Sequence, residues 1–402
     1  MNHEPDNSAP ETYRELVRRR HRGQRFRKRI LVLLAVVVAV VGALVFWISQ
    51  TMISPPRPRI SDSERPVIGV VLRDDPAGGA EVVSAVPPAA AAGLRAGDRI
   101  VSVDGFPVQS ARQLRSRIDA AADGELLRLE ARRARPEGVV LMDVAVEIRA
   151  VSPLDLGLEF QEVAFSNPWG LTLRGWYIPP PGMAASSAPG IAYGHGNAAD
   201  RRHWLDLAPA IHRAGFGQLL LDFSGRGESQ GEVITLGLRE AGDLRSAVEF
   251  LTGRPEIDSS RIYLAGRSMG AVAAVLAAAD GAPVRALVLD SPFADLGRIA
   301  DEAISGIFRP AVPLRPLAFM VTGWRTGFDP SEVSPIDAVR RIDVPMLILH
   351  GTEDRIVSFE HSRDLAEAAA GPVRLVPIPG VGHNDPRPPA VVETILEFLR
   401  SS

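Results

Sequence analysis

The sequence predicts an α/β protein in which a mostly parallel sheet is covered by helices, joined to a small α+β domain and one N-terminal transmembrane helix. Three observations lead to this prediction. Strands and helices alternate from residue 190 to the C-terminus, which is typical of a parallel sheet. Short strands around a single helix fill residues 67–150, and residues 30–49 form an uncharged apolar run.

The composition excludes several classes of function. A length of 402 residues allows two or three domains, and the net charge of −3 gives no electrostatic basis for binding nucleic acid. The chain has no cysteine, which excludes disulfides, thiolate metal sites and a cysteine nucleophile. Because neither metal-ligand spacing nor a phosphate-binding glycine loop occurs, we expect no metal and no cofactor.

The N-terminus has the features of a membrane anchor. Residues 1–29 form a polar tail that is strongly basic near its end, and the run at 30–49 would span about 30 Å as a helix, which matches a hydrocarbon core. Phe46 and Trp47 lie at its far end, where aromatic side chains favour the interface. The basic residues predict that the tail is cytoplasmic and that everything after residue 50 lies outside the cytoplasm, in the periplasm where the cell has one. A cleaved signal peptide is the alternative, but no small-residue cleavage site follows.

A proline-rich linker at 50–66 leads to a domain at 67–150. Strands are expected at 67–72, 81–86, 99–105, 126–132 and 139–148, and a helix at 110–122. The run Ala-Ala-Ala-Gly-Leu-Arg-Ala-Gly-Asp-Arg-Ile-Val-Ser-Val-Asp-Gly at 90–105 resembles the signature of bacterial PDZ domains, such as those of periplasmic trypsin-like proteases and intramembrane metalloproteases.

The PDZ resemblance implies a groove between a strand and a helix that binds the C-terminus of a peptide or protein partner. The backbone N–H groups of Ile68, Gly69 and Val70 would bind the terminal carboxylate, and the peptide would add as an edge strand. Leu114 and Ile118 would line the helix side of the groove. The alternative is that the domain is only a spacer.

The remaining chain, 155–402, begins with a hairpin in residues 156–181 around Asn-Pro-Trp-Gly at 167–170. Strands then follow at 190–193, 217–222, 262–265, 286–289, 345–349 and 373–377. Three helices are expected between these strands, at 202–214, 238–251 and 271–279, and a last helix at 390–399 follows the final strand. This alternation predicts that the loops after the strands meet at one edge of the sheet.

Gly266-Arg-Ser-Met-Gly270 lies between an expected strand and an expected helix. This context turns the G-x-S-x-G pattern into a nucleophile elbow, in which Ser268 is raised above the sheet edge. The two glycines are needed because the turn leaves no room for a Cβ. The helix N-terminus beneath the serine favours negative charge.

An oxyanion hole is expected beside Ser268. The His-Gly loop at 195–196 follows the first buried strand, and the backbone N–H groups of Asn197 and Met269 would bind the charged oxygen. We expect His195 to support this loop rather than to act as the base, because a better-placed histidine follows.

That histidine is His383, in a glycine-rich loop after the last strand, and the acid expected to orient it is Asp354, after the penultimate strand. The chain order Ser268, Asp354, His383 is the order of this fold, and the serine needs both partners to become nucleophilic. Asp290 and Glu353 are the alternatives for the acid.

These motifs together resemble the α/β-hydrolase superfamily over residues 155–402. The similarity is strongest to its single-pass membrane branch, which includes lipid- and acyl-thioester-directed hydrolases, and it extends to serine aminopeptidase-like members. The resemblance implies the α/β-hydrolase fold and a serine hydrolase, but it does not give the substrate. Our hypothesis is a membrane-anchored enzyme that cleaves small acyl esters or thioesters. Two alternatives remain open: a serine peptidase guided by the PDZ-like domain, and a catalytically silent membrane-tethered adaptor.

Residues 304–324 are rich in large apolar side chains and lie where the fold places cap or pocket elements. They could form an acyl pocket near the membrane, or they could simply pack on the sheet. The residues concerned are Ile307, Phe308, Leu314, Leu317, Phe319, Met320 and Trp324.

Overall fold

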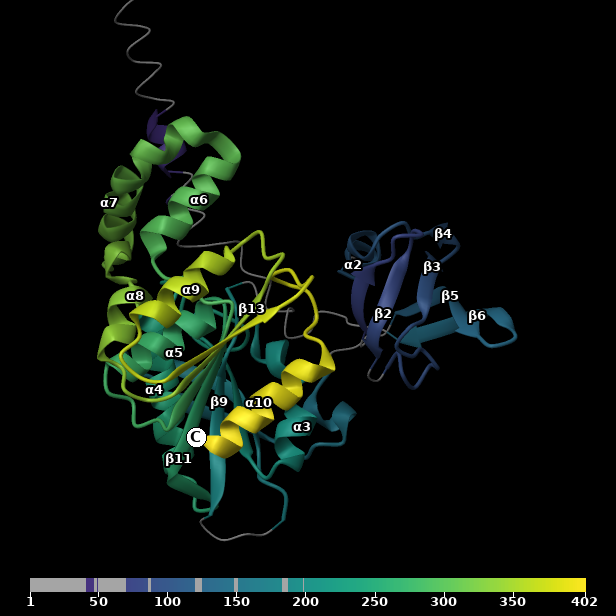
Figure 1. The fold of residues 1–402 in the computed structure, drawn as a ribbon, viewed down its shortest axis with the longest axis horizontal. Coiled ribbons are helices and arrows are strands. Elements are labelled where there is room, and N and C mark those ends of the chain that lie inside the picture. The colour runs from purple at the N-terminus through teal and green to yellow at the C-terminus, as the bar shows by residue number, and fades with distance from the viewer. Residues whose placement is uncertain are drawn as a thin grey trace, which may run out of the picture.

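The computed structural model describes residues 41–46, 49, 70–85, 88–119, 125–147, 151–182, 187–197 and 199–402. Its described strands form two sheets, one in each of the two expected folded regions (Figure 1). The predicted tail at 1–29 and the linker at 50–66 lie outside the described residues, as does most of the predicted anchor at 30–49.

The smaller sheet follows the expected order of elements over 70–147. It has strand order β1-β2-β3-β5-β6, with β4 paired to β3, and all its pairs are antiparallel. Its elements are β1 (Val70–Asp74), β2 (Ala80–Ala85), β3 (Arg99–Val103), β4 (Phe106–Pro107), α2 (Ala111–Asp119), β5 (Leu126–Arg135) and β6 (Gly138–Glu147).

The larger sheet has eight strands in the order β14-β13-β12-β11-β9-β10-β8-β7. The first six in this order run parallel, and β8 and β7 complete one edge as the expected antiparallel hairpin. The strands are β7 (Gln161–Ser166), β8 (Thr172–Ile178), β9 (Ala188–Gly194), β10 (Gly217–Asp222), β11 (Ile257–Arg267), β12 (Ala286–Asp290), β13 (Met346–Gly351) and β14 (Val373–Ile378).

Strands β9 and β11 are neighbours in the middle of this sheet, and the chain leaves them in opposite directions. From β9 it crosses to β10 on one side, and from β11 it crosses to β12 on the other. In open α/β sheets, a crevice forms at the carboxyl ends of strands where the direction switches. The topology therefore brings the loops that follow residues 194 and 267 to one crevice.

Helices cover both faces of the sheet, as expected. Helices α3 (Ala208–Arg213) and α10 (Pro389–Ser401) lie on one face, and α4 (Leu238–Thr252) and α5 (Met269–Ala279) lie on the other (Figure 1). The strand β11 shows why two cores form, since Tyr263 and Ala265 belong to one cluster while Leu264 belongs to the other. Alternate side chains of a strand point to opposite faces.

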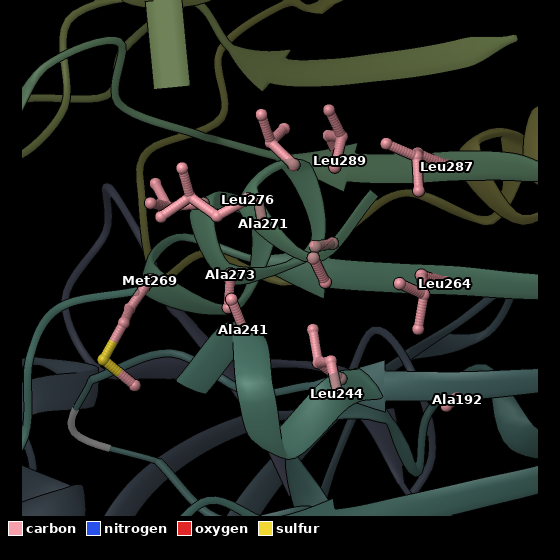
Figure 2. Packing of buried hydrophobic residues seen from close by; sticks show 14 of the residues in the cluster. Ala192, Ala241, Leu244, Leu264, Met269, Ala271, Ala273, Leu276, Leu287 and Leu289 are labelled. Carbon is pink, nitrogen blue, oxygen red and sulfur yellow. The ribbon is translucent and has the colours of Figure 1, made fainter. Parts of the chain in front are cut away.

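The alanine-rich sequence of α5 allows close packing beneath the elbow. Figure 2 shows Ala273 of α5 beside Ala241 of α4, with Leu264 of β11 and Leu289 of β12 along the sheet. Small side chains let the two helices approach each other and fix α5 against β11. The N-terminus of α5, which carries the elbow, is therefore held rigidly.

Between β12 and β13, the segment that contains the apolar residues at 304–324 forms a helical cap. Its main helices are α6 (Leu296–Phe308) and α7 (Arg315–Thr326), joined by the 3-10 helix η4 (Arg309–Leu314). Three short elements, η5 (Pro330–Glu332), α8 (Pro335–Ala338) and η6 (Val339–Arg341), return to the sheet, and α9 (Phe359–Ala368) follows β13. Two further 3-10 helices are η2 (Pro153–Leu156) and η3 (Arg201–Trp204).

Residues 41–46 are helical, and they lie beside α7. Within the part of the chain that the structure describes, no helix is both long and apolar enough to cross a membrane.

Candidate active site

The loop between β11 and α5 has the geometry of a nucleophile elbow. Ser268 has φ 53° and ψ −119°, a conformation that L-residues rarely adopt. A Cβ on Gly266 would lie 2.1 Å from the carbonyl oxygen of Gly270, and one on Gly270 would lie 2.2 Å from the carbonyl oxygen of Gly194. Both contacts are with backbone that cannot yield, so the turn requires glycine at both positions.

The three residues predicted to form a triad are hydrogen-bonded to one another. His383 Nε2 lies 3.0 Å from Ser268 Oγ, and His383 Nδ1 lies 2.6 Å from Asp354 Oδ2. With the Nδ1 proton donated to the carboxylate, Nε2 is free to accept the serine proton. This arrangement can turn Ser268 into a nucleophile.

Asp354 is held as a carboxylate at the end of β13. Its other oxygen, Oδ1, accepts hydrogen bonds from the backbone N–H groups of Ile356 at 2.9 Å and Val357 at 2.8 Å. Burial acts to raise the pKa of Asp354, but hydrogen bonds from His350 and His383 outweigh it and hold the pKa well below its usual range. A carboxylate that stays ionised can stabilise the imidazolium that forms during catalysis.

His350, which the sequence pattern did not mark as a site residue, also contacts this carboxylate. Its Nε2 lies 2.9 Å from the carbonyl oxygen of Val357 and 3.3 Å from Asp354 Oδ2. Both are acceptors, so Nε2 carries a proton, and Nδ1 lies 2.6 Å from the hydroxyl oxygen of Ser362. The ring is fully buried and fixes the acid loop.

The two alternative acids have other environments. Asp290 is buried and bound by two arginines, with Arg387 Nε and Nη2 at 2.9 and 2.8 Å and Arg267 Nε at 2.9 Å. Burial acts to raise the pKa of Asp290, but these two guanidinium groups hold it well below its usual range. Glu353 is exposed, and its side chain makes no hydrogen bond to another described residue. Neither of these carboxylates is a hydrogen-bond partner of the His383 ring, whose described partners are Asp354 and Ser268.

Arg387 is a second residue that the sequence did not single out. Besides binding Asp290, it donates to three carbonyl oxygens of the loop that carries the base: Gly382 at 3.0 Å, His383 at 3.2 Å and Asp385 at 2.8 Å. A single buried guanidinium thus ties the His383 loop to the end of β12. It positions the imidazole without touching the reacting atoms.

The loop after β9 lies against the elbow, where an oxyanion hole was expected. A Cβ on Gly194 would be 3.1 Å from the Cα of Gly270, so the two loops are in close contact. Asn197 is held there by Arg226, which donates to its backbone oxygen at 2.7 Å and to its Oδ1 at 2.8 Å. Met269 is the first residue of α5, so its N–H has no partner within the helix.

His195 supports this loop, as expected. It is fully buried, its Nε2 accepts the N–H of Phe223 at 3.0 Å, and its Nδ1 lies 2.7 Å from the carbonyl oxygen of Gly196. Burial lowers the pKa of His195 to about 4, so the ring is neutral at physiological pH. Its described ring partners do not include Ser268.

The predicted peptide groove differs from expectation on its helix side. Ile68 and Gly69 lie outside the described residues, and Val70 begins β1. The side chains of Leu114 and Ile118 do not line an open groove, because both are buried in the core under the smaller sheet. The exposed side chain of Arg115 instead donates to the carbonyl oxygen of Leu72 at 2.6 Å.

No group of histidine, aspartate and glutamate side chains in the described part of the chain is arranged to hold a metal ion.

Comparison with known proteins agrees with this organisation. Residues 80–133 match the model of PDZ domains, and residues 226–401 match the model of the prolyl oligopeptidase family. An uncharacterized protein of Mycobacterium tuberculosis is 36% identical over 226 residues, which are 56% of this chain and 73% of that protein. The uncharacterized protein YfhR of Escherichia coli K12 is 30% identical over 56% of this chain and 74% of its own length.

The alpha/beta hydrolase domain-containing protein WAV2 of Arabidopsis thaliana is 30% identical over 55% of this chain and 70% of its own length. The chain belongs to the α/β-hydrolase family. Among solved structures, an esterase of Pyrococcus furiosus is 23% identical, with a TM-score of 0.49 over 62% of this chain and 96% of that one. This α/β-hydrolase is a serine hydrolase.

Proposed function

We propose that this α/β-hydrolase is a membrane-anchored, extracytoplasmic enzyme that cleaves ester or thioester bonds through an acyl-enzyme on Ser268. The observation that carries the proposal is the hydrogen-bonded chain from Ser268 Oγ through His383 to Asp354. The PDZ-like domain would recruit the C-terminus of a protein partner or of a protein-borne substrate.

In the acylation step, Ser268 Oγ attacks the carbonyl carbon of the substrate while His383 Nε2 accepts the hydroxyl proton. The carbonyl oxygen becomes an oxyanion, which the N–H groups of Asn197 and Met269 would bind. Asp354 stabilises the imidazolium. When the tetrahedral intermediate collapses, the bond to the alcohol or thiol breaks, and His383 gives its proton to that leaving group.

In the deacylation step, a water molecule takes the place of the leaving group. His383 Nε2 accepts a proton from the water, whose oxygen attacks the acyl carbon of the ester on Ser268. The second tetrahedral intermediate then releases the carboxylic acid, and the proton on His383 returns to Ser268 Oγ. Atoms and protons balance over the two steps, and one bond is hydrolysed.

A fluorophosphonate probe tests the nucleophile, because it phosphonylates only a serine that a general base has activated. The native chain should become labelled, and Ser268→Ala should not. Circular dichroism of both proteins would show that they are folded. A folded native chain that does not react would refute the proposed activity.

A serine peptidase is the second candidate, and the match of residues 226–401 to the prolyl oligopeptidase family favours it. Matched substrates that share one acyl group, with an alcohol, a thiol or an amine as the leaving group, separate the two activities. Cleavage of the amide without cleavage of the ester would replace the first proposal by the second.

The proposed location depends on the apolar run at 30–49 and the basic residues before it. A reporter that is active only outside the cytoplasm, fused after residue 402, should be active. An inactive reporter, together with activity of a cytoplasmic reporter at the same position, would contradict the proposed topology.

A further inference from the structure

The cap carries exposed apolar side chains that the sheet does not cover. We call these residues the cap patch: Ile307, Phe308, Leu317, Met320 and Trp324. Trp324 is 87% exposed, Ile307 is 73% exposed and Met320 is 63% exposed. Single exposed apolar residues are common, but a group of this size on two consecutive helices marks a surface that meets an apolar partner.

Helix α7 shows how the patch arises from the sequence. Leu317, Met320 and Trp324 are spaced at i, i+3 and i+7, which places them on one face of the helix. Phe319 points instead into the core of the hydrolase domain. The helix therefore has an exposed apolar stripe in addition to the face that holds it in the fold.

A third face of α7 contacts the end of the predicted membrane anchor. Val45 is buried against Ala318, and Ser49 Oγ accepts a hydrogen bond from Thr322 Oγ1 at 3.0 Å. The guanidinium of Arg325 lies 4.8 Å from the ring centre of Phe46. Figure 1 shows the helical residues 41–46, in purple, beside the ends of α6 and α7 that are farthest from the sheet.

These contacts constrain where the cap can lie. Residues 41–49 are the last nine of the apolar run at 30–49, and at 1.5 Å per residue they account for about 13 Å of a spanning helix. Without them, the run has only eleven residues, too few to cross a hydrocarbon core. A spanning helix must therefore keep residues 41–49 in the membrane, and α7 contacts Val45, Phe46 and Ser49 of this stretch.

The charges near the patch fit such a position. Residues 303–326 include three arginines and no aspartate or glutamate. Arg309 lies at the turn between the helices, and the acidic residues of α6 are in its first half, toward the sheet. In space, Arg315 binds Asp301, and Asp329 and Glu332 line the pocket that Met320 and Trp324 also line, so the excess of arginine belongs to the tip of the cap around Arg309. Apolar side chains beside an arginine, with no acid in residues 303–314, suit this tip to the boundary of a bilayer that contains anionic lipids.

We infer that the tip of the cap, with the cap patch, lies in the outer leaflet of the bilayer that holds the anchor. This inference rests on the anchoring part of the proposed function, but not on the reaction. The cap patch would then contact lipid. The hydrolase domain would be held against the bilayer by its cap as well as by the anchor.

The absence of cysteine from the chain makes a direct test possible. Ile307→Cys and Met320→Cys place a nitroxide label on the cap patch of the full chain, reconstituted in vesicles of phosphatidylcholine and phosphatidylglycerol. Val139→Cys and Leu154→Cys are matched controls, since these residues are 69% and 63% exposed outside the cap. Molecular oxygen concentrates in lipid, and a nickel chelate stays in water. The ratio of the label's accessibility to oxygen and to the nickel chelate therefore shows whether the label lies in lipid or in water.

We expect an oxygen-to-nickel ratio several-fold higher at both cap positions than at both controls. Equal ratios would overturn the inference. Labels shielded from both oxygen and the nickel chelate would also overturn it, because protein would then cover the cap patch. Dipolar broadening between labels would in that case identify a second copy of the chain as the partner. Alkaline carbonate extraction of membranes tests the anchor separately. A retained chain with water-exposed cap labels refutes the inference alone, whereas an extracted chain refutes the anchor as well.

Discussion

Replacing Arg226 by methionine removes the clamp on the oxyanion loop and leaves the triad in place. The arginine side chain is buried, and its two hydrogen bonds to Asn197 fix both the backbone oxygen and the side chain of that residue. Methionine has a similar length and keeps much of the packing. The N–H of Asn197 would still be present, but it would no longer be held in one position.

The size of the effect follows from what is lost. Removing an oxyanion-hole donor entirely costs about 10²–10³ in kcat. Because Arg226→Met loosens a donor without deleting it, we expect kcat to fall by about 10–100-fold, which corresponds to about 1.4–2.7 kcal/mol. The bound substrate carries no oxyanion, and the charge develops only on the way to the tetrahedral intermediate, so KM should change by less than about twofold.

The assay is steady-state hydrolysis of a soluble ester, with circular dichroism to establish folding. Arg226→Lys keeps the charge but can make only one of the two bonds well, so it should fall between the native protein and Arg226→Met. Arg254→Met is the control, since that arginine lies over Tyr177, 4.1 Å from its ring centre, and does not contact the site. A folded Arg226→Met with native kcat, or with its loss entirely in KM, would refute the role of Asn197.

Three further predictions concern the acid, the elbow and a buried histidine. Asp354→Asn should lower kcat by about 10⁴-fold in the same assay without unfolding the protein, since an amide favours the wrong tautomer of the base; near-native kcat would contradict its role. Gly270→Ala should lower the melting temperature strongly, because its Cβ would lie 2.2 Å from backbone; Gly306→Ala, with nothing within 4 Å of its Cβ, is the control. The pKa of His195 falls from 6.5 in the unfolded chain to about 4, so the folded state binds fewer protons and stability should drop as pH falls from about 6.5 to 4. Urea titrations across this range should show that His195→Gln removes a slope of up to about 1.4 kcal/mol per pH unit; an unchanged slope would contradict the buried neutral ring.

The sequence was sufficient for the parts of the site that depend on local pattern. Ser268 lies in a tight turn between a strand and a helix, and both glycines of that turn can be identified because no other residue fits. Asp354 and His383 follow the last two strands of the large sheet, and the carboxyl ends of parallel strands meet at one edge. Because all three residues follow parallel strands, they lie at the same edge of the sheet.

The supporting residues could not be found in this way. Arg387 binds Asp290 across 97 positions of sequence, and Arg226 binds Asn197 across 29. Arginine is common on surfaces, and nothing in the neighbouring sequence distinguishes a buried arginine that holds a loop. The signal lies only in the partners, which the fold brings together.

The PDZ-like helix shows another limit of sequence patterns. Leu114 and Ile118 lie on one face of α2, and this spacing correctly predicts an apolar face. It does not say what that face meets. In the structure it is buried in the core, and Arg115 occupies the side toward the edge strand β1.

Two carboxylates at the ends of neighbouring strands, Asp290 on β12 and Asp354 after β13, differ in function through their partners. Both stay ionised, one through two arginines and the other through two histidines and two backbone N–H groups. Only Asp354 touches the imidazole of His383, but Asp290 holds Arg387, which binds the backbone of the same histidine. Asp290, the alternative candidate for the catalytic acid, therefore helps to hold the loop of the catalytic base His383 through Arg387. The catalytic histidine is fixed at its ring by one carboxylate and at its main chain, through an arginine, by the other.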